Sequence, residues 1–354
     1  MSRFFSERFA ELTPYTPGEQ PRERRYVKLN TNESPFPPSP RAIAAAAKAA
    51  ESLQLYCDPS AKLLSEKVAG RYGISPDEVI LTNGSDEVLN FAFMAYCDMA
   101  HPAAFPDITY GFYKVFAALH NIPYEQIPLC DDLSICVEDY IGINKTIFIA
   151  NPNAPTGKIL PPSEIERILV SNPDNVVVVD EAYIDFGGES CVPLVHKYEN
   201  LLVTQTFSKS RSMAGARLGF GIGCKKLIAD LHTIRFSTNP YNVNSMTMAA
   251  GLGVMEDEAY TQKNCQTVCE NRHFLMQELQ KMGFDMTDSV ANFVFAKHER
   301  IEGGVLYAKL KEKGILVRHF DQPRIKDYNR ITVGAREEID ALLCATQEIL
   351  EEMK

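Results

Sequence analysis

Hydrophobic and polar positions along the first two thirds of the chain alternate between short apolar runs and longer amphipathic stretches. Two of the runs are continuously apolar: Val176–Val179 throughout, and Thr146–Ala150 after Thr146. This is expected for strands covered by helices on both faces. The pattern predicts seven strands, at Val79–Thr82, Ala103–Phe105, Tyr124–Pro128, Thr146–Ala150, Val176–Val179, Leu201–Thr204 and Phe220–Gly223. Expected helices are Asp86–Cys97, Tyr110–Leu119, Pro162–Val170 and Lys225–Arg235, with an earlier one starting at Pro40 behind the N-cap Ser39. This alternation predicts an α/β domain with a mainly parallel sheet.

The pattern changes at about Asn242, where longer helical stretches begin. Helices are expected at Ser245–Met255, Ala259–Met282, Gly304–Lys313 and Arg336–Met353, and strands at Phe293–Ala296, Ile315–Arg318 and Arg330–Val333. Strands clustered with helices in this way predict a smaller α+β domain. We therefore expect an N-terminal arm over residues 1–30, a large domain over 31–240 and a small C-terminal domain over 241–354.

Composition narrows the class of protein. The chain has 354 residues and a formal net charge of −10, which argues against binding to nucleic-acid phosphates, although local Arg residues could still hold a small anion. No stretch has the apolar core of a signal peptide or the length of a membrane span, so we expect no membrane association. The nine scattered cysteines suit free thiols in a reducing cytoplasm. Cys265 and Cys269 lack a second ligand pair with zinc spacing, so no metal site is expected.

A lysine closes the run Thr206-Phe-Ser-Lys209, and Arg217 follows eight residues later in a Gly-containing loop. An ammonium at the end of a buried strand is costly to desolvate. A Schiff base with an aldehyde cofactor removes that cost, and lysine is the side chain that forms it. Ser208 and Arg217 could then hold the cofactor's phosphate. Taken alone, the motif also fits an ordinary surface lysine.

A carboxylate ends the apolar run Val176–Val179, in the sequence Asp180-Glu-Ala-Tyr183. Open α/β sheets bind ligands at the carboxyl ends of their strands. Opposite a pyridine nitrogen, Asp180 would keep that nitrogen protonated, and a protonated ring is an electron sink. Tyr183 could hydrogen-bond the ring hydroxyl. The alternative role for Asp180 is a helix N-cap.

Three further segments follow predicted strands. Asn83-Gly-Ser85-Asp86-Glu87 leads into a helix, so its amides form a candidate anion site or an ordinary cap. Two prolines and a glycine stiffen the turn Asn151–Gly157. Tyr110 opens a helix and could stack on a flat ring, or serve as a boundary aromatic.

With these motifs the chain resembles the fold-type I pyridoxal-phosphate enzymes of the class I and II aminotransferases, and among them the histidinol-phosphate aminotransferases. The resemblance runs almost end to end, from Pro14–Gly18 through Leu29–Pro35 to Arg330–Glu338. The Asp180–Tyr183 and Ser208–Arg217 motifs are shared across the superfamily and indicate the cofactor. The terminal motifs are narrower and indicate the substrates, histidinol phosphate with 2-oxoglutarate or glutamate, and thus a step of histidine biosynthesis. The implied fold is a mainly parallel seven-stranded sheet flanked by helices, with a smaller α+β domain and an N-terminal arm.

The resemblance also implies residue roles. Lys209 forms the Schiff base with pyridoxal 5'-phosphate and moves the proton, Asp180 pairs with the ring nitrogen, and Tyr183 bonds the ring hydroxyl. Tyr110 stacks on the ring, and the phosphate is held by Ser85, Asp86, Ser208 and Arg217. Tyr56 matches a tyrosine lent to the neighbouring subunit, which implies a homodimer with shared active sites. The substrate is recognised by Tyr15, Asn32, Arg318 and Arg330.

Two positions depart from the family pattern. Cys57 follows Tyr56 where Pro is usual. Ala154 precedes Pro-Thr-Gly where many relatives have the Asn that bonds the ring hydroxyl, so Asn153 is the candidate replacement. Three other activities stay open on the sequence: an aromatic or broad-specificity aminotransferase, a threonine-phosphate decarboxylase, and a cofactor-binding regulator without turnover. The preferred amino donor, and the choice between transamination and decarboxylation, are not decided by these motifs.

Overall fold

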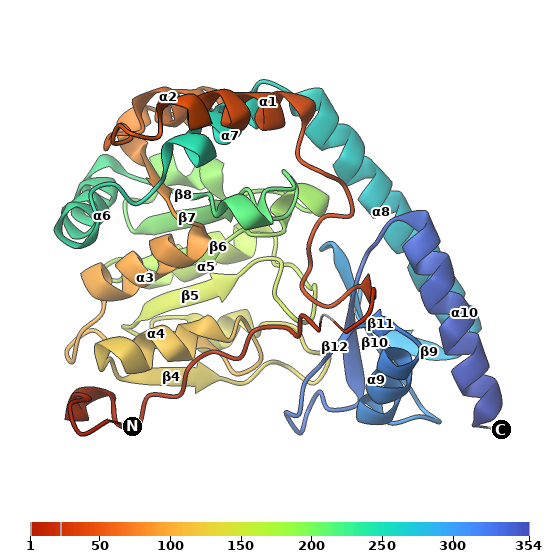
Figure 1. Ribbon diagram of the computed structural model, residues 1–354. Helices are drawn as coiled ribbons and strands as arrows, with labels where there is room; N and C mark the ends of the chain where they lie inside the picture. The colour runs from red at the N-terminus through yellow and green to blue at the C-terminus, as the bar shows by residue number, and fades with distance from the viewer. Residues whose placement is uncertain (1, 22, 354) are drawn as a thin grey trace.

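The computed structural model describes residues 2–21 and 23–353. A large sheet flanked by helices forms one side of the molecule, and a small sheet with the long helices α8 (Glu258–Lys281) and α10 (Arg336–Glu352) forms the other (Figure 1). The N-terminal segment runs beside β4 (Tyr124–Ile127), crosses between the two sides and climbs to α1 (Pro40–Ala49). Within the described residues, no helix is both long and apolar enough to cross a membrane.

The large sheet has seven strands, as predicted. Their order is β2 (Val79–Thr82), β8 (Gly219–Gly223), β7 (Leu201–Thr206), β6 (Val177–Asp180), β5 (Thr146–Ala150), β3 (Ala103–Pro106) and β4. Only β8 runs antiparallel to its neighbours, and the other pairings are parallel. Every residue of the central strands β5, β6 and β7 is buried, which explains their continuous apolar runs.

Helices cover both faces of this sheet. Alternate residues of one strand enter different apolar clusters, because side chains point to opposite faces. In β6, Val177 and Val179 pack in one cluster and Val178 in the other. The helices are α1, α2 (Lys62–Tyr72), α3 (Ser85–Tyr96), α4 (Phe112–His120), α5 (Pro162–Ser171), α6 (Lys225–Thr238) and α7 (Ser245–Met255). Helix α2 was not predicted, whereas the Ser39 cap of α1 is confirmed by a 3.2 Å hydrogen bond from the Ala42 amide.

The C-terminal part is α+β, as predicted, with differences in its strands. Its antiparallel sheet has the order β12 (Arg318–His319), β13 (Tyr328–Thr332), β10 (Phe293–His298) and β9 (Phe284–Met286), and α9 (Gly303–Glu312) packs beside it. The strand predicted at Ile315–Arg318 is in fact two. Its first half, β11 (Ile315–Leu316), pairs in parallel with β1 (Val27–Lys28) of the N-terminal segment. Its second half, β12, pairs with β13.

Short 3-10 turns complete the fold. They are η1 (Glu7–Phe9), η2 (Ala50–Ser52), η3 (Pro76–Glu78), η4 (Val137–Tyr140), η5 (Ile184–Phe186), η6 (Val192–His196) and η7 (Ala214–Ala216). Two of them bear on the candidate site: η5 follows β6, and η7 lies between β7 and β8.

Candidate active site

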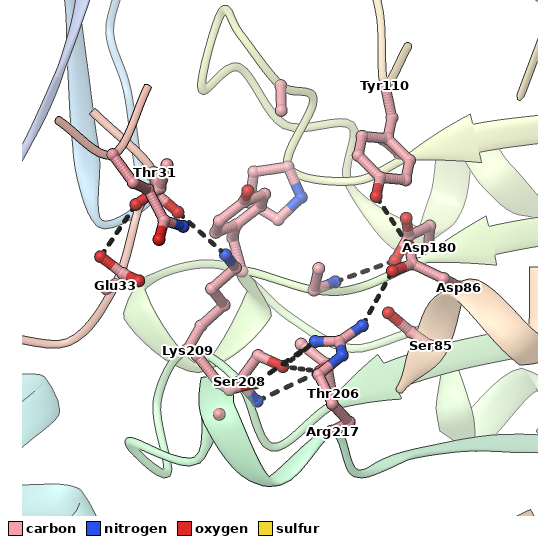
Figure 2. Close-up of a pocket in the computed structure, with 18 residues that line it drawn as sticks. Thr31, Glu33, Ser85, Asp86, Tyr110, Asp180, Thr206, Ser208, Lys209 and Arg217 are labelled. Atoms are coloured by element: carbon pink, nitrogen blue, oxygen red, sulfur yellow. Dashed lines mark hydrogen bonds and ion pairs between the residues drawn. The ribbon is translucent and has the colours of Figure 1, made fainter. Parts of the chain in front are cut away.

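A cavity of about 380 Å³ lies at the carboxyl ends of the parallel strands. The strands β5, β6 and β7 run the same way, so the segments that follow them meet at one edge of the sheet. The structure brings most of the predicted cofactor residues together here (Figure 2). Those lining the cavity are Ser85, Asp86, Tyr110, Asp180, Tyr183, Ser208, Lys209 and Arg217.

Lys209 follows β7 and points into this cavity. Its Nζ donates a 3.3 Å hydrogen bond to the carbonyl of Thr31 and lies 5.8 Å from the Tyr183 ring centroid. Burial of the ammonium, followed by the positive charge of Arg330, lowers the pKa of Lys209 to about 8. A fraction of this amine is therefore uncharged near neutral pH and able to act as a nucleophile.

Asp180 is the last residue of β6 and is 5% exposed. Its Oδ1 accepts from the Ala182 amide at 3.2 Å and its Oδ2 accepts from the Tyr113 hydroxyl at 3.3 Å. Burial, and then the negative charge of Asp86, raise the pKa of Asp180 to about 7. A positive group placed against this carboxylate would be stabilised, and would in turn stabilise its ionised form.

Arg217 and Asp86 form the floor of the cavity. Arg217 Nη2 lies 2.9 Å from Asp86 Oδ2, and the Tyr110 hydroxyl donates to Asp86 Oδ1 at 2.7 Å. The Ser208 hydroxyl accepts from Arg217 Nη1 at 3.4 Å. Ser85 begins α3, a helix of 12 residues, so free amides of its first turn lie beside these groups.

Glycines make this close approach possible. A Cβ on Gly84, whose φ is +83°, would lie 2.6 Å from Arg217 Nη2. A Cβ on Gly219 would lie 2.3 Å from the Ser85 backbone nitrogen. One guanidinium, two serine hydroxyls and a helix N-terminus thus surround one point, which is a donor set that fits a phosphate group.

Tyr183 is held from the other side by Asn32. Asn32 Nδ2 donates to the Tyr183 hydroxyl at 2.9 Å, and its Oδ1 accepts from Thr332 Oγ1 at 3.2 Å. Asn32 has a left-handed backbone, with φ of 55°, and is buried. The segment before α1 is therefore part of the site wall.

A second cavity, of about 650 Å³, adjoins the first and shares Thr31, Tyr110, Tyr183 and Lys209 with it. The four predicted substrate residues, Tyr15, Asn32, Arg318 and Arg330, all line it. Arg330 donates to the Asn30 carbonyl at 3.2 Å, but its buried Nε has no partner among the described residues.

Arg318 and Tyr15 tie the N-terminal segment to the second cavity. Arg318 donates to the carbonyls of Thr16 and Pro17 at 3.3 and 3.4 Å. The Tyr15 ring stacks on Phe112 with centroids 4.3 Å apart. The segment expected to be an arm therefore forms the outer wall of this cavity.

Two predicted cofactor residues are not brought to the first cavity. Asn153 donates to the Ile108 carbonyl and to Thr156 Oγ1, at 3.0 and 3.2 Å, and accepts from Thr109 at 2.7 Å. These bonds engage the side-chain amide of Asn153 in the turn after β5. Ala154, not Asn153, lines the cavity. The structure therefore gives no support to Asn153 as the replacement for the Asn that bonds the ring hydroxyl in many relatives. Tyr56 is 85% exposed and stacks on Tyr241, with centroids 4.6 Å apart.

Other residues at the site were missed from the sequence. Thr31, Glu33 and Gln20 line the first cavity. Tyr113 reaches Asp180 from the core of α4, three residues after Tyr110. Tyr110 lies before α4, which begins at Phe112, so the two tyrosines share no helix and the sequence held no signal for this contact. No group of three His, Cys, Asp or Glu side chains suited to a metal ion occurs in the described part of the chain.

Comparison with known proteins gives consistent matches. The profile of the family "Aminotransferase class I and II" matches residues 24–345. Histidinol-phosphate aminotransferase of Aromatoleum aromaticum is 48% identical over 355 residues, covering 99% of this chain and 100% of the relative. Histidinol-phosphate aminotransferase 1 of Pseudomonas aeruginosa is 48% identical, covering 98% and 99%. The crystal structure of the Sinorhizobium meliloti histidinol-phosphate aminotransferase, in complex with pyridoxal-5'-phosphate, superposes with a TM-score of 0.90 at 21% identity, covering 100% of both chains.

Proposed function

The chain belongs to the class I and II aminotransferase family, and on that premise we propose that it transfers the amino group of histidinol phosphate to 2-oxoglutarate, in histidine biosynthesis. The observation that carries this proposal is the full-length identity, at 48%, with curated enzymes of that name. Pyridoxal 5'-phosphate is the cofactor. When bound, it supplies a ring that takes up the electron pair left at the substrate carbon when that carbon loses a proton.

We assign the floor of the first cavity to the cofactor's phosphate. The Ser85 and Ser208 hydroxyls, the Arg217 guanidinium and the first amides of α3, including that of Asp86, would hold it. The carboxylate of Asp86 keeps Arg217 and Tyr110 in place. Tyr110 also lines the cavity, where its ring would pack against the cofactor.

We assign proton handling to Lys209 and Asp180. Lys209 would anchor the cofactor, and its free amine would accept and return the proton of the substrate carbon, a task suited to an amine with a pKa of about 8. Asp180 would keep the ring nitrogen of the cofactor protonated, and the Tyr183 hydroxyl, which Asn32 orients, would hydrogen-bond the ring oxygen. Because Asn153 is used elsewhere, Tyr183 fills this role without it.

Substrate recognition is assigned to the second cavity. Histidinol phosphate has no α-carboxylate, so its phosphate is the strong anion that a cationic site can select. Arg330 and Arg318 line this cavity together with Lys209 and Lys114, and Tyr15 also lines it. A guanidinium binds phosphate with paired hydrogen bonds, which favours this assignment over a general apolar pocket.

We also propose a homodimer with shared active sites, working in the cytoplasm. Exposed apolar side chains gather around Tyr56 in sequence: Leu53, Leu55, Tyr56 and Leu63 are between 52% and 85% exposed. Large apolar side chains exposed this close together in the chain favour burial against a second copy. The nine cysteines are all free thiols, which suits a reducing compartment.

A panel of amino donors tests the function. The purified enzyme is given 2-oxoglutarate with histidinol phosphate, histidinol, phenylalanine or threonine phosphate, and glutamate formation is measured. Histidinol phosphate should give the highest kcat/KM. Higher turnover of phenylalanine would favour an aromatic aminotransferase, and carbon dioxide released from threonine phosphate without glutamate would favour the decarboxylase.

A further inference from the structure

Tyr113 is a core residue with a single polar contact. It is the second residue of α4, has 0% exposure, and lines neither cavity. Its ring is enclosed by Phe105, Tyr110 and Phe148, with centroids 5.7, 5.7 and 5.8 Å away. Among the described residues, the one hydrogen-bond partner of its hydroxyl is Asp180 Oδ2, at 3.3 Å.

Asp180 has no cation of the protein beside it. No ion pair includes it in the described part of the chain, and its donors are two neutral groups, the Ala182 amide and the Tyr113 hydroxyl. The charges with the largest effect on its pKa are both acidic, Asp86 in α3 and Glu181 directly after β6, while Lys209 and Arg217 line the same cavity without pairing with it. The remaining titratable neighbours, Tyr110 and Tyr183, are phenols whose pKa is raised by burial. The carboxylate therefore depends on hydrogen bonds to stay ionised.

We propose that Tyr113 is a positioning residue, which holds the Asp180 carboxylate ionised and turned toward the ring nitrogen of the cofactor. This inference rests on the proposed function, because it assumes that Asp180 faces that nitrogen. It adds a residue that touches neither the cofactor cavity nor the substrate cavity and acts only through Asp180.

The direction of the effect follows from the chemistry of the bond. A hydroxyl that donates to a carboxylate stabilises the charged form, so the Tyr113 bond lowers the pKa of Asp180, while burial raises it to about 7. Removing the hydroxyl leaves Oδ2 without a hydrogen bond to offset burial and the two acidic neighbours, which raise the pKa of Asp180. The pKa of Asp180 then rises, and a larger share of the protein holds a neutral acid where a carboxylate is needed.

The chain offers a matched control in Tyr140. It is 1% exposed, and its hydroxyl is also buried but has no hydrogen-bond partner. Tyr113→Phe and Tyr140→Phe each remove one buried oxygen and leave the ring packing in place. Any difference between the two variants therefore reports the bond to Asp180 rather than the loss of a core hydroxyl. Thermal unfolding of both variants checks that the fold is retained.

The first experiment measures cofactor binding without turnover. Cofactor-free wild type and both variants are titrated with pyridoxal phosphate by equilibrium dialysis, over a pH series from mildly acidic to mildly alkaline. For Tyr113→Phe, the acid limb of the plot of affinity against pH should move to higher pH. At the acid end the affinity should fall about tenfold, which corresponds to the lower end of the range of free energies for hydrogen bonds to charged groups. Tyr140→Phe should match the wild type.

The second experiment uses the loaded enzyme. Tyr113→Phe should lower kcat about tenfold with KM for the amino donor within about twofold, because the variant keeps the substrate cavity intact. In an Asp180→Asn background, the same substitution should have no further effect on kcat. The inference is overturned if Tyr113→Phe matches Tyr140→Phe in both binding and kcat, or if its effect persists with Asp180→Asn. If the wild type binds no pyridoxal phosphate at all, the proposed function itself fails.

Discussion

Arg217 and Asp86 form a 2.9 Å ion pair across the floor of the cavity, joining the loop before β8 to the first turn of α3. The two residues are 131 positions apart in the chain. Asp86 therefore has two effects. It orients the guanidinium and the Tyr110 hydroxyl, and its charge raises the pKa of both Asp180 and Lys209.

Removing that charge should shift the pH profile in a defined direction. In Asp86→Asn the ionised form of Asp180 becomes less costly, so its pKa falls from about 7, and the ammonium of Lys209 loses an attractive neighbour, so its pKa falls from about 8. Because both groups act in their deprotonated forms, the acid limb of the kcat/KM profile should move to lower pH. An unchanged acid limb would show that Asp86 does not act on Asp180. Glu199→Gln, at an exposed ion pair, is the control.

Lys209→Ala should abolish turnover, because among the described residues no other amine lines the cavity to anchor the cofactor and move the proton. Borohydride reduction of the loaded wild type, followed by peptide mapping, should place the label on Lys209. The control Lys226→Ala changes an exposed lysine, whose side chain is 86% exposed, and should keep full activity. A label on another lysine would contradict the assignment.

Arg330→Ala should erase most of the preference for histidinol phosphate over histidinol. A hydrogen bond to a charged group contributes about 1.5–3 kcal/mol, which corresponds to roughly ten- to a hundred-fold in kcat/KM. Arg330→Lys should restore the preference only in part, because an ammonium cannot present two parallel donors. Steady-state kinetics with both donors measures this, and an unchanged ratio in Arg330→Ala would place the phosphate elsewhere.

Subunit mixing tests whether Tyr56 completes the partner's site. Tyr56→Ala and Lys209→Ala should each be nearly inactive alone. If sites are shared across a two-fold axis, a mixed dimer has one site with both residues intact, so unfolding and refolding an equal mixture should recover about a quarter of wild-type activity. No recovery from a mixture that does form dimers would argue against shared sites.

The buried pair Arg211–Asp185 should matter for stability. Asp185 Oδ2 lies 2.9 Å from Arg211 Nη1, and the Ser210 hydroxyl also donates to it. Asp185→Asn leaves the Arg211 charge buried without a counter-ion, so the free energy of unfolding should fall by about 3–5 kcal/mol. Glu199→Gln, at an exposed pair, should cost about 0–1 kcal/mol. Denaturant unfolding of both variants makes the comparison.

The pH dependence of that stability has a definite sign. Burial acts to raise the pKa of Asp185, but the charges of Arg211 and Arg71 and the hydrogen bonds from Ser210 and Arg211 together outweigh it, so the net pKa is lowered. A carboxyl with a lowered folded-state pKa stabilises the fold at pH values above its unfolded pKa, about 4, and loses this contribution as pH falls toward the folded value. The gap in stability between wild type and Asp185→Asn should therefore narrow in acid.

Local sequence patterns determined most of the fold. Short apolar runs alternating with amphipathic stretches identified the strands of the large sheet, and the continuously apolar runs of β5 and β6 marked strands buried on both faces. The chemistry-bearing residues that follow those strands, Lys209, Asp180 and Ser85, were also found, because parallel strands bring their carboxyl ends to one edge. Both inferences rest on short-range patterns.

Only the tertiary structure decided what depends on distant partners. The pairing of β1 with β11 joins Val27 to Ile315, and two-residue strands carry no pattern of their own. Asn153 looked like a site residue by its position, but its amide is used within its own turn and by Ile108 and Thr109. Tyr113 was not singled out from the sequence; it is a core residue whose hydroxyl bonds Asp180, 67 residues away. A side chain's type shows what it can bond, whereas folding decides which partner is within reach.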